Sequence, residues 1–208
     1  MAYIVILGDL VASKEITGRA AFQQRLTDTL AQISAANPAI CSPYTLTLGD
    51  EFQAVYQRAA GLAADLCRVR LACLPHRVRF VISLGEIVTA INPRQAIGMD
   101  GPAFHAARAH IETLKTTDRD WALVGARLGE SAARDAIIDL LGAHVETWKA
   151  NRWDILHGLL TGESIPDLIT RTNISSPAVY KNISHGRLES VVTLFKELES
   201  RLDAGLAR

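Results

Sequence analysis

The sequence lacks most of the features by which common classes of protein are recognised. It has three cysteines, Cys41, Cys67 and Cys73, and no Cys-x-x-Cys pair. That pattern argues against a disulfide framework or a zinc knuckle and for free thiols in a reducing cytosol. The six histidines lack zinc-site spacing, and there is neither a P-loop nor a Gly-x-Ser-x-Gly motif. Serine hydrolase and P-loop kinase chemistry are therefore not indicated.

Long apolar runs and an excess of charge are missing as well. No stretch approaches the roughly 18 apolar residues of a membrane span, and the N-terminus enters a strand-like segment without a basic leader. The formal net charge is zero, so any contact with DNA has to come from local charge. We expect a soluble, cytoplasmic protein with no membrane partner.

What the chain does have is enough apolar sequence for a core. Its 208 residues are 49% hydrophobic and 21% charged, which is typical of one large or two small folded domains. Apolar runs and alternation predict strands at 3–7, 44–48, 52–56, 78–88 and 121–124, and helical spacing predicts helices at 19–34, 59–73, 103–114 and 131–141. The βαββαβ order predicts an α+β, ferredoxin-like palm over residues 1–147, an antiparallel sheet with helices on one face.

Two of the predicted strands carry a Gly-Asp pair at one end. The first apolar run ends at Gly8 and Asp9, and the hairpin has Asp50 and Glu51 at its tip. In a palm these two segments are neighbours, so the carboxylates of Asp9 and Asp50 are expected about 4–5 Å apart, within reach of one Mg²⁺ or Mn²⁺ ion. The alternative is two unrelated aspartates in a turn and a helix cap.

Four blocks of sequence resemble the class III nucleotidyl cyclase homology domain, which has a palm-type fold. They appear in the order expected for that family and comprise residues 6–13, 48–52, 79–88 and 97–108. The details are closer to the SatD family of bacterial proteins, which has no established activity. Its hallmarks stand here as Gly-Asp-Leu-Val-Ala-Ser-Lys, Leu-Gly-Asp-Glu-Phe-Gln and Gly-Met-Asp-Gly-Pro-Ala-Phe.

The resemblance implies roles for individual residues. Asp9 and Asp50, with Glu51 beside them, would be metal ligands, and Arg108 would be the phosphate-stabilising catalytic arginine. The chain departs from the cyclase pattern at Phe104, where that family has asparagine, and at Leu46, where it has a purine-reading lysine.

Three further residues are candidates for contact with a nucleotide phosphate. Ser13 and Lys14 follow Asp9 closely, and Asp100 lies in a glycine-rich loop. The hydroxyl and the ammonium can bind phosphate oxygens. The alternatives are a helix cap, a solvated lysine and a turn-forming aspartate.

The C-terminal part, residues 148–208, changes to short helices, and residues 167–183 fit a helix-turn-helix. Asn173 stands at the turn, where a left-handed conformation is needed, and Ser176 with Pro177 fits the start of the second helix. A final helix is expected over residues 187–202. The segment 151–208 has seven Lys or Arg and seven Asp or Glu residues, so it is neutral overall.

Polar and basic residues nevertheless gather on or just after the second helix of this motif, which reads the major groove in DNA-binding relatives. The candidate DNA contacts are Ser176, Tyr180, Lys181, Asn182, His185 and Arg187. The alternative is a trihelical interaction module.

Three functional hypotheses follow. The first is a transcriptional regulator whose palm binds a nucleotide with Mg²⁺ and whose helix-turn-helix binds DNA, acting as a homodimer. The second is a metal-dependent nucleotidyl cyclase or nucleotidyltransferase. The third is an interaction module without a ligand.

Overall fold

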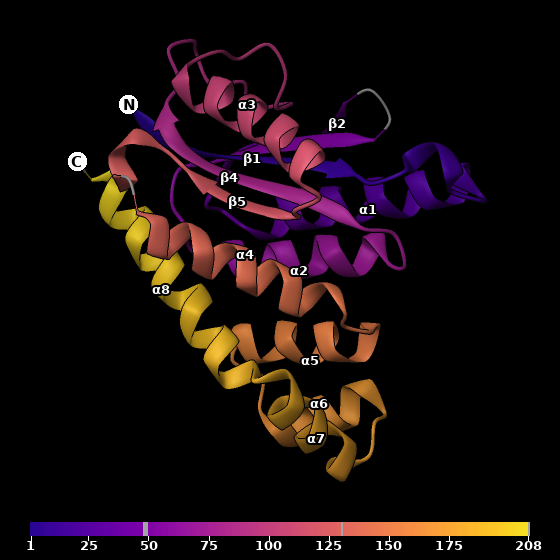
Figure 1. Ribbon diagram of the computed structural model, residues 1–208. Helices are drawn as coiled ribbons and strands as arrows, with labels where there is room; N and C mark the ends of the chain where they lie inside the picture. Colours follow the sequence, from indigo (N-terminus) through magenta and orange to yellow (C-terminus); the bar gives the residue numbers. More distant parts are fainter. Residues whose placement is uncertain (48–49, 130, 208) are drawn as a thin grey trace.

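The computed structural model describes residues 1–47, 50–129 and 131–207 (Figure 1). Leu48 and Gly49, which belong to the Gly-Asp hairpin motif, lie outside the described residues. The sheet part of the chain comprises β1 (Ala2–Leu10), η1 (Ser13–Glu15), α1 (Arg19–Ala36), β2 (Ile40–Thr47), β3 (Glu51–Tyr56), α2 (Leu62–Cys73), β4 (Val78–Glu86), α3 (Pro102–Thr117), β5 (Trp121–Val124), η2 (Ala126–Leu128) and α4 (Ala132–Glu146). The remaining helices are α5 (Ala150–Leu160), α6 (Ile165–Thr172), α7 (Ser176–Gly186) and α8 (Leu188–Leu206).

The sheet has the strand order β2-β3-β1-β4-β5. The first four strands pair antiparallel, and with α1 and α2 they give the split βαβ arrangement of a ferredoxin-like fold. The α+β palm predicted from the sequence is therefore confirmed. The fifth strand, β5, pairs parallel to β4, so the sheet is mixed and not purely antiparallel.

The helices cover both faces of the sheet, which corrects the prediction of a single helical layer. Alternate residues of β1 belong to two hydrophobic clusters: Ile4 and Ile6 pack with α1 and α2, whereas Val5 and Leu7 pack with α3. Figure 1 shows α3 on one side of the strands and α1 and α2 on the other. Apolar residues on both faces of β1 explain its unbroken hydrophobic run.

Two element boundaries differ from the sequence-based prediction in ways that matter for the site. β1 extends through Asp9 to Leu10, and β3 begins at Glu51. Glu51 is thus paired within the sheet, opposite Thr47 and Asp9, and does not lie at the hairpin tip. Asp50 is the described turn residue before β3, and its carbonyl accepts a hydrogen bond from the Leu10 amide at 2.9 Å.

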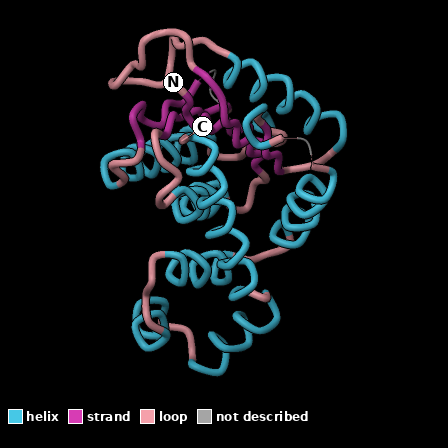
Figure 2. The backbone as a smooth tube through the Cα atoms, turned by 90° about the vertical axis from the view of Figure 1, so that its left-hand side faces the viewer, coloured by secondary structure: helices cyan, strands magenta, loops and turns pink. Residues whose placement is uncertain are grey.

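Helices α5, α6 and α7 form a lobe at the end of the molecule away from α3 (Figure 2). Helix α8 runs from this lobe back to the sheet, so that the C-terminus lies near the N-terminus in both views. The α8 residues Val191, Phe195, Leu198 and Leu202 are buried in the same hydrophobic cluster as the sheet residues facing α1 and α2. One continuous core therefore crosses the predicted domain boundary at residues 147 and 148.

Candidate functional site

A charged cluster replaces the apolar packing at one end of the sheet. On the face toward α3, β1 alternates Val5, Leu7 and Asp9, so the last of these inward positions is a carboxylate. In register, Asp9 lies opposite Glu51 on β3 and Arg79 on β4. Directly opposed residues share one face of a sheet, so the strand pairing itself brings these three charges together.

Glycine before Asp9 is required by packing. Gly8 lies opposite Phe52, and a Cβ atom at Gly8 would stand 2.1 Å from Cζ of the Phe52 ring. The Phe52 ring is itself fully buried among the residues that face α1 and α2. At Gly8 the backbone of β1 thus packs closely against the Phe52 ring, and the next residue, Asp9, places its carboxylate on the other face of the sheet, toward α3.

Helix α3 supplies two more cations to the cluster. Lys115 Nζ lies 3.4 Å from Asp9 Oδ1 and 3.6 Å from Glu51 Oε1, and Arg108 Nη1 pairs with Glu51 Oε2. Arg79 Nη1 lies 3.2 Å from Asp9 Oδ2. All four oxygens of the two buried carboxylates therefore face a cation. Arg108 and Lys115 are seven residues apart, which places them on the same side of α3.

Burial and the neighbouring charges shift the pKa values of this cluster in opposite directions. Burial raises the pKa of Asp9 above its usual value, and the neighbouring Lys115 and Arg79 only partly offset the effect. For Lys115, burial lowers the pKa, but the nearby Glu112, Asp9 and Glu51 outweigh it and the pKa is raised. The Lys115 ammonium therefore stays charged. Its ion pair with Asp9 forms only when Asp9 is ionised, and burial disfavours that ionisation.

The cluster fits a divalent cation in its chemistry but not in its present arrangement. Asp9, Asp50 and Glu51 offer the hard oxygen donors that Mg²⁺ prefers. Over residues 1–47, 50–129 and 131–207, however, no three acidic, histidine or cysteine side chains are grouped so that they could hold a metal. The oxygens of Asp9 and Glu51 face Arg79, Arg108 and Lys115 instead.

Two of the predicted phosphate contacts lie next to this end of the sheet. Ser13, in η1, is buried and donates a hydrogen bond from Oγ to Asp50 Oδ2 at 2.7 Å. Lys14 follows it and is exposed. The hydroxyl of Ser13 therefore fixes the Asp50 carboxylate.

Asp100 is not part of the cluster. It precedes α3, where its carboxylate accepts a hydrogen bond from the Gly101 amide and lies 2.6 Å from His105 Nε2. Lys115 is near the other end of α3, about 20 Å away along a helix that rises 1.5 Å per residue. Asp100 therefore serves the start of α3, as the turn interpretation expected, and is separated from Asp9.

Sequence reasoning missed Arg79 and Lys115 as members of the cluster. The signal for Arg79 is a charge in an otherwise buried strand, between Val78 and Phe80. The signal for Lys115 is its spacing of two helical turns from Arg108. Neither signal can be used before the pairing of β1 with β4 and the position of α3 over the sheet are known.

The second candidate surface is the helix pair α6 and α7, which covers the segment where a helix-turn-helix was predicted. Asn173 adopts the left-handed conformation (φ 53°, ψ 33°) that the turn requires, as expected from the sequence. Leu168 and Val179 are buried, and Ile174 and Ile183 pack against the same cluster. The N-cap of α7 is Ser175, and Ser176 is its first helical residue, so the helix begins one residue earlier than the sequence indicated.

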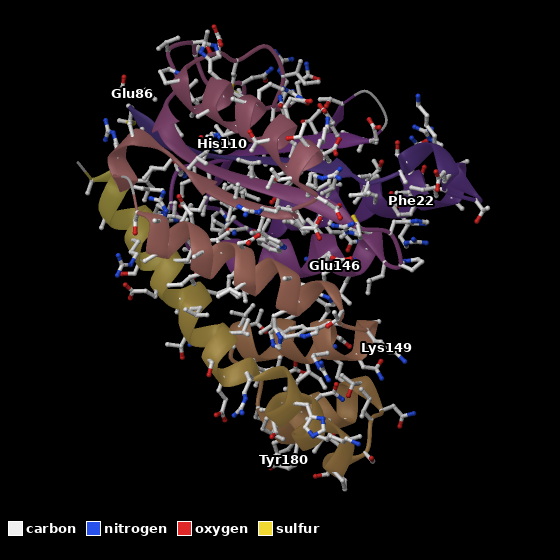
Figure 3. The ribbon with its side chains drawn as sticks, viewed as in Figure 1. Phe22, Glu86, His110, Glu146, Lys149 and Tyr180 are labelled. Atoms are coloured by element: carbon white, nitrogen blue, oxygen red, sulfur yellow. The ribbon has the colours of Figure 1, made fainter. Side chains whose placement is uncertain are left out.

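The outer face of α7 presents most of the predicted DNA contacts to solvent. Tyr180 is 57% exposed and lies at the end of the molecule (Figure 3). The other exposed candidates are Ser176, Lys181, His185 and Arg187. No aspartate or glutamate occurs within α7, so this face is locally basic although the whole segment is neutral.

Asn182 occupies a different position from the one expected of a base-reading residue. Its Nδ2 donates to the Ala178 carbonyl at 2.9 Å, and its Oδ1 accepts from Arg152 Nε at 3.3 Å. Its amide thus bonds within α7 and to α5. It is only partly exposed because it follows Val179 by three residues, on the inner side of the helix.

Comparison with known proteins identifies a family and finds weak similarity to solved structures. The profile of the SatD family matches residues 3–190 of the chain. A solved structure of a bacterial light-regulated adenylyl cyclase is similar with a TM-score of 0.38 and 12% identity, over 59% of this chain and 43% of the cyclase chain. The match thus spans less than half of that protein, and the ferredoxin-like assignment rests on the strand order and not on this likeness.

The search of curated proteins and the inspection of the helices for membrane spans both gave negative results. No curated protein matches the chain. In the described ranges, no helix combines the length and the apolar character needed to cross a lipid bilayer.

Proposed function

The chain belongs to the SatD family, and we propose that it is a regulator whose sheet part binds a nucleotide with a divalent cation and whose α7 binds DNA. The observation that carries the first half is the pairing of Asp9 and Glu51 with cations of α3. The carboxylates are fixed by the sheet, whereas the cations stand on long, flexible side chains.

Exchange of partners explains how such a cluster accepts a ligand. The side chains of Lys115 and Arg108 are 33% and 51% exposed, whereas those of Asp9 and Glu51 are 7% and 10% exposed. A metal-bound triphosphate brings a cation for the buried carboxylates and phosphate oxygens for the two cations of α3. Each charge that loses a partner gains another, so binding leaves none of them unpaired.

Arg79 supports the same proposal. Its guanidinium is buried beside Asp9, and its Nε has no hydrogen-bond partner among the described residues. A buried donor without a partner is uncommon in a folded protein. Together with Lys115 and Arg108 it makes this end of the sheet suited to an anion that carries several oxygens.

Thermal unfolding in the presence of ligands tests the nucleotide site. We expect nucleoside triphosphates with Mg²⁺ or Mn²⁺ to raise the melting temperature, because a ligand at 100 times its dissociation constant stabilises the folded state by about 2.7 kcal/mol. Asp9→Asn and Lys115→Ala should abolish the rise. Asp100→Asn is the matched control and should retain it, since Asp100 lies at the far end of α3.

The triphosphate with the metal, the triphosphate alone and the metal alone are measured separately, and each result has a different meaning. A rise with the triphosphate alone would indicate direct binding to the cations without a metal. A rise with the metal alone would indicate a cation site without a nucleotide. No rise with any of the three, in a folded protein, would contradict the proposed site. Analysis of the products formed by the mixtures that give a rise separates binding from cyclisation or nucleotidyl transfer.

DNA binding is proposed from the exposed face of α7. Lys181→Ala and Arg187→Ala should each weaken binding and reduce its dependence on salt, because each removes a phosphate neutralisation. Tyr180→Ala should lower sequence preference more than salt dependence, since a side chain that reaches a base edge carries specificity. Lys196→Ala, an exposed lysine on α8, is the matched control.

The measurement is a titration against the chain's own upstream DNA and against a random duplex at several salt concentrations. Equal losses for Lys196→Ala and Lys181→Ala would mean that α7 is not the contact surface. Absence of binding even at low salt would leave the helix-turn-helix as an interaction module.

A further inference from the structure

Helices α4 and α8 expose an apolar face that the sheet core does not use. A groove of about 440 Å³ lies between them, with Leu123, Leu128 and Leu198 among its lining residues. Ile137 of α4 and Leu194 of α8 also line it and are 47% and 40% exposed, and Leu140, three residues after Ile137 on α4, is 71% exposed. A contiguous apolar surface of this kind marks an interaction site more often than scattered apolar residues do.

The outward side of α4 is apolar along most of its length. Ala133, Ala136, Ile137, Leu140 and Ala143 recur at three- and four-residue spacing, and all of them are exposed. The opposite side, with Leu141 and Val145, packs in the core. α4 is therefore apolar on two sides, and only one of them is covered by this chain.

We propose that this face binds the same face of a second copy of the chain, forming a two-fold symmetric homodimer. In a symmetric contact one patch has to provide both the protruding and the receiving surface. The α4–α8 face has both, since Ile137 and Leu140 are exposed one helical turn apart on α4 and Ile137 lies in the wall of the groove. The ridge of each copy enters the groove of the other.

The charges around the groove also favour a second copy over a strongly charged partner. Arg127, Arg134 and Arg201 each pair with an acidic residue of the same chain, respectively Glu86, Asp135 and Glu197. The rim is thus neutral and carries both signs, which complements an identical rim. The formal net charge of the chain is zero, so two copies approach without long-range repulsion.

The mass of the protein in solution tests this proposal. Sedimentation of the full chain at several concentrations should give twice the chain mass of 22.6 kDa. Leu140→Glu and Leu194→Glu should each raise the dimer dissociation constant by about 100-fold or more, because each places two unpaired carboxylates in the contact. Both positions are exposed, so circular dichroism should show an unchanged fold.

Val88→Glu is the matched control. Val88 is 69% exposed and lies in the chain between β4 and α3, outside the α4–α8 face, and this variant should remain dimeric. A wild-type protein that stays monomeric at high concentration overturns the proposal. A dimer that survives Leu140→Glu and Leu194→Glu, or that dissociates with Val88→Glu, shows that another face makes the contact and equally overturns it.

Discussion

At the scale of single residues, packing explains why the Gly-Asp pair of β1 begins with glycine. The Phe52 ring occupies the space where a side chain at position 8 would begin. Gly8→Ala should therefore destabilise the fold by about 3 kcal/mol, at the upper end of overpacking costs. Chemical denaturation measures the change.

The double variant Gly8→Ala with Phe52→Leu separates this explanation from a backbone effect. A smaller side chain at position 52 leaves room for the new methyl group, so part of the lost stability should return. If the two losses simply add, the ring contact is not the cause.

A buried acid far from the charged cluster predicts how stability depends on pH. Burial raises the pKa of Asp65, and hydrogen bonds from Asn37 and Tyr56 only partly offset this effect. As the pH rises above 3.8, the unfolded chain loses this proton first, so ionisation of Asp65 costs stability that is recovered on acidification.

Asp65→Asn should consequently gain stability relative to the wild type as the pH rises through the raised pKa of Asp65. Denaturation of both proteins at a series of pH values measures the difference. Asp9, whose raised pKa does not depend on Asp65, titrates in both proteins and cancels in the difference. Glu199 does not cancel fully, because the charge of Asp65 contributes to raising its pKa. A difference that does not vary with pH would contradict the burial argument.

Helices α2 and α8, far apart in the chain, meet at the start of α2. Glu199 Oε1 accepts a hydrogen bond from the Ala63 amide at 2.9 Å, and Asp203 Oδ1 accepts from the Ala59 amide at 2.7 Å. The first amides of a helix have no partner within it, so α8 supplies the carboxylates that a local cap would otherwise provide.

Glu199→Ala should cost about 1 kcal/mol, the usual loss for a helix cap, and lower the melting temperature by about 3 °C in a chain of this length. Glu197→Ala is the matched control, because Glu197 pairs with Arg201 on the surface and exposed pairs contribute little. Equal losses for the two variants would mean that the contact with Ala63 does not stabilise α2.

The elements themselves were largely predictable, because each has a clear period. α1, β5 and α7 lie within a few residues of the ranges expected from apolar spacing. The side of the sheet that α3 covers was not predictable, since the stripe formed by Ala107, Ile111 and Leu114 is the same for either face. The parallel pairing of β5 also depends on contacts distant in sequence.

The candidate site was predictable in composition but not in arrangement. Asp9 and Asp50 stood out through their Gly-Asp pairs, whereas Glu51 was placed at a turn. A shift of one residue at the start of β3 moves it into the sheet opposite Asp9, because side chains alternate with a period of two. Whether Asp9 and Asp50 share a metal ion remains a prediction.

At the scale of the whole molecule, the hydrophobic cluster that faces α1 and α2 continues into α5–α8, and this affects the predicted division into residues 1–147 and 148–208. Phe195 of α8 contacts Trp121 of β5, with ring centroids 6.1 Å apart. Residues 1–147 alone should therefore lose cooperative unfolding and expose apolar surface, because the α8 side of the cluster is missing.

Thermal unfolding and binding of an apolar dye measure this effect. A chain that keeps α8 but replaces residues 161–187 with a Gly/Ser linker is the control and should unfold cooperatively. If residues 1–147 alone unfold at the same temperature as the full chain, the two parts are independent domains, as predicted from the sequence.

Helix α8 connects the sheet to α7, so a movement at one end of it is passed to the other. At one end its Gly205 packs against Leu84 of the sheet, and at the other Arg187 joins it directly to α7. A helix of this length spans about 28 Å, so a rigid tilt about its sheet end would move its α7 end the most. A tilt of about 10° at the pivot sweeps the far end by roughly 5 Å, a large part of the roughly 12 Å width of the major groove. Small movements beneath α8 would thus be magnified at α7, the helix proposed above to bind DNA.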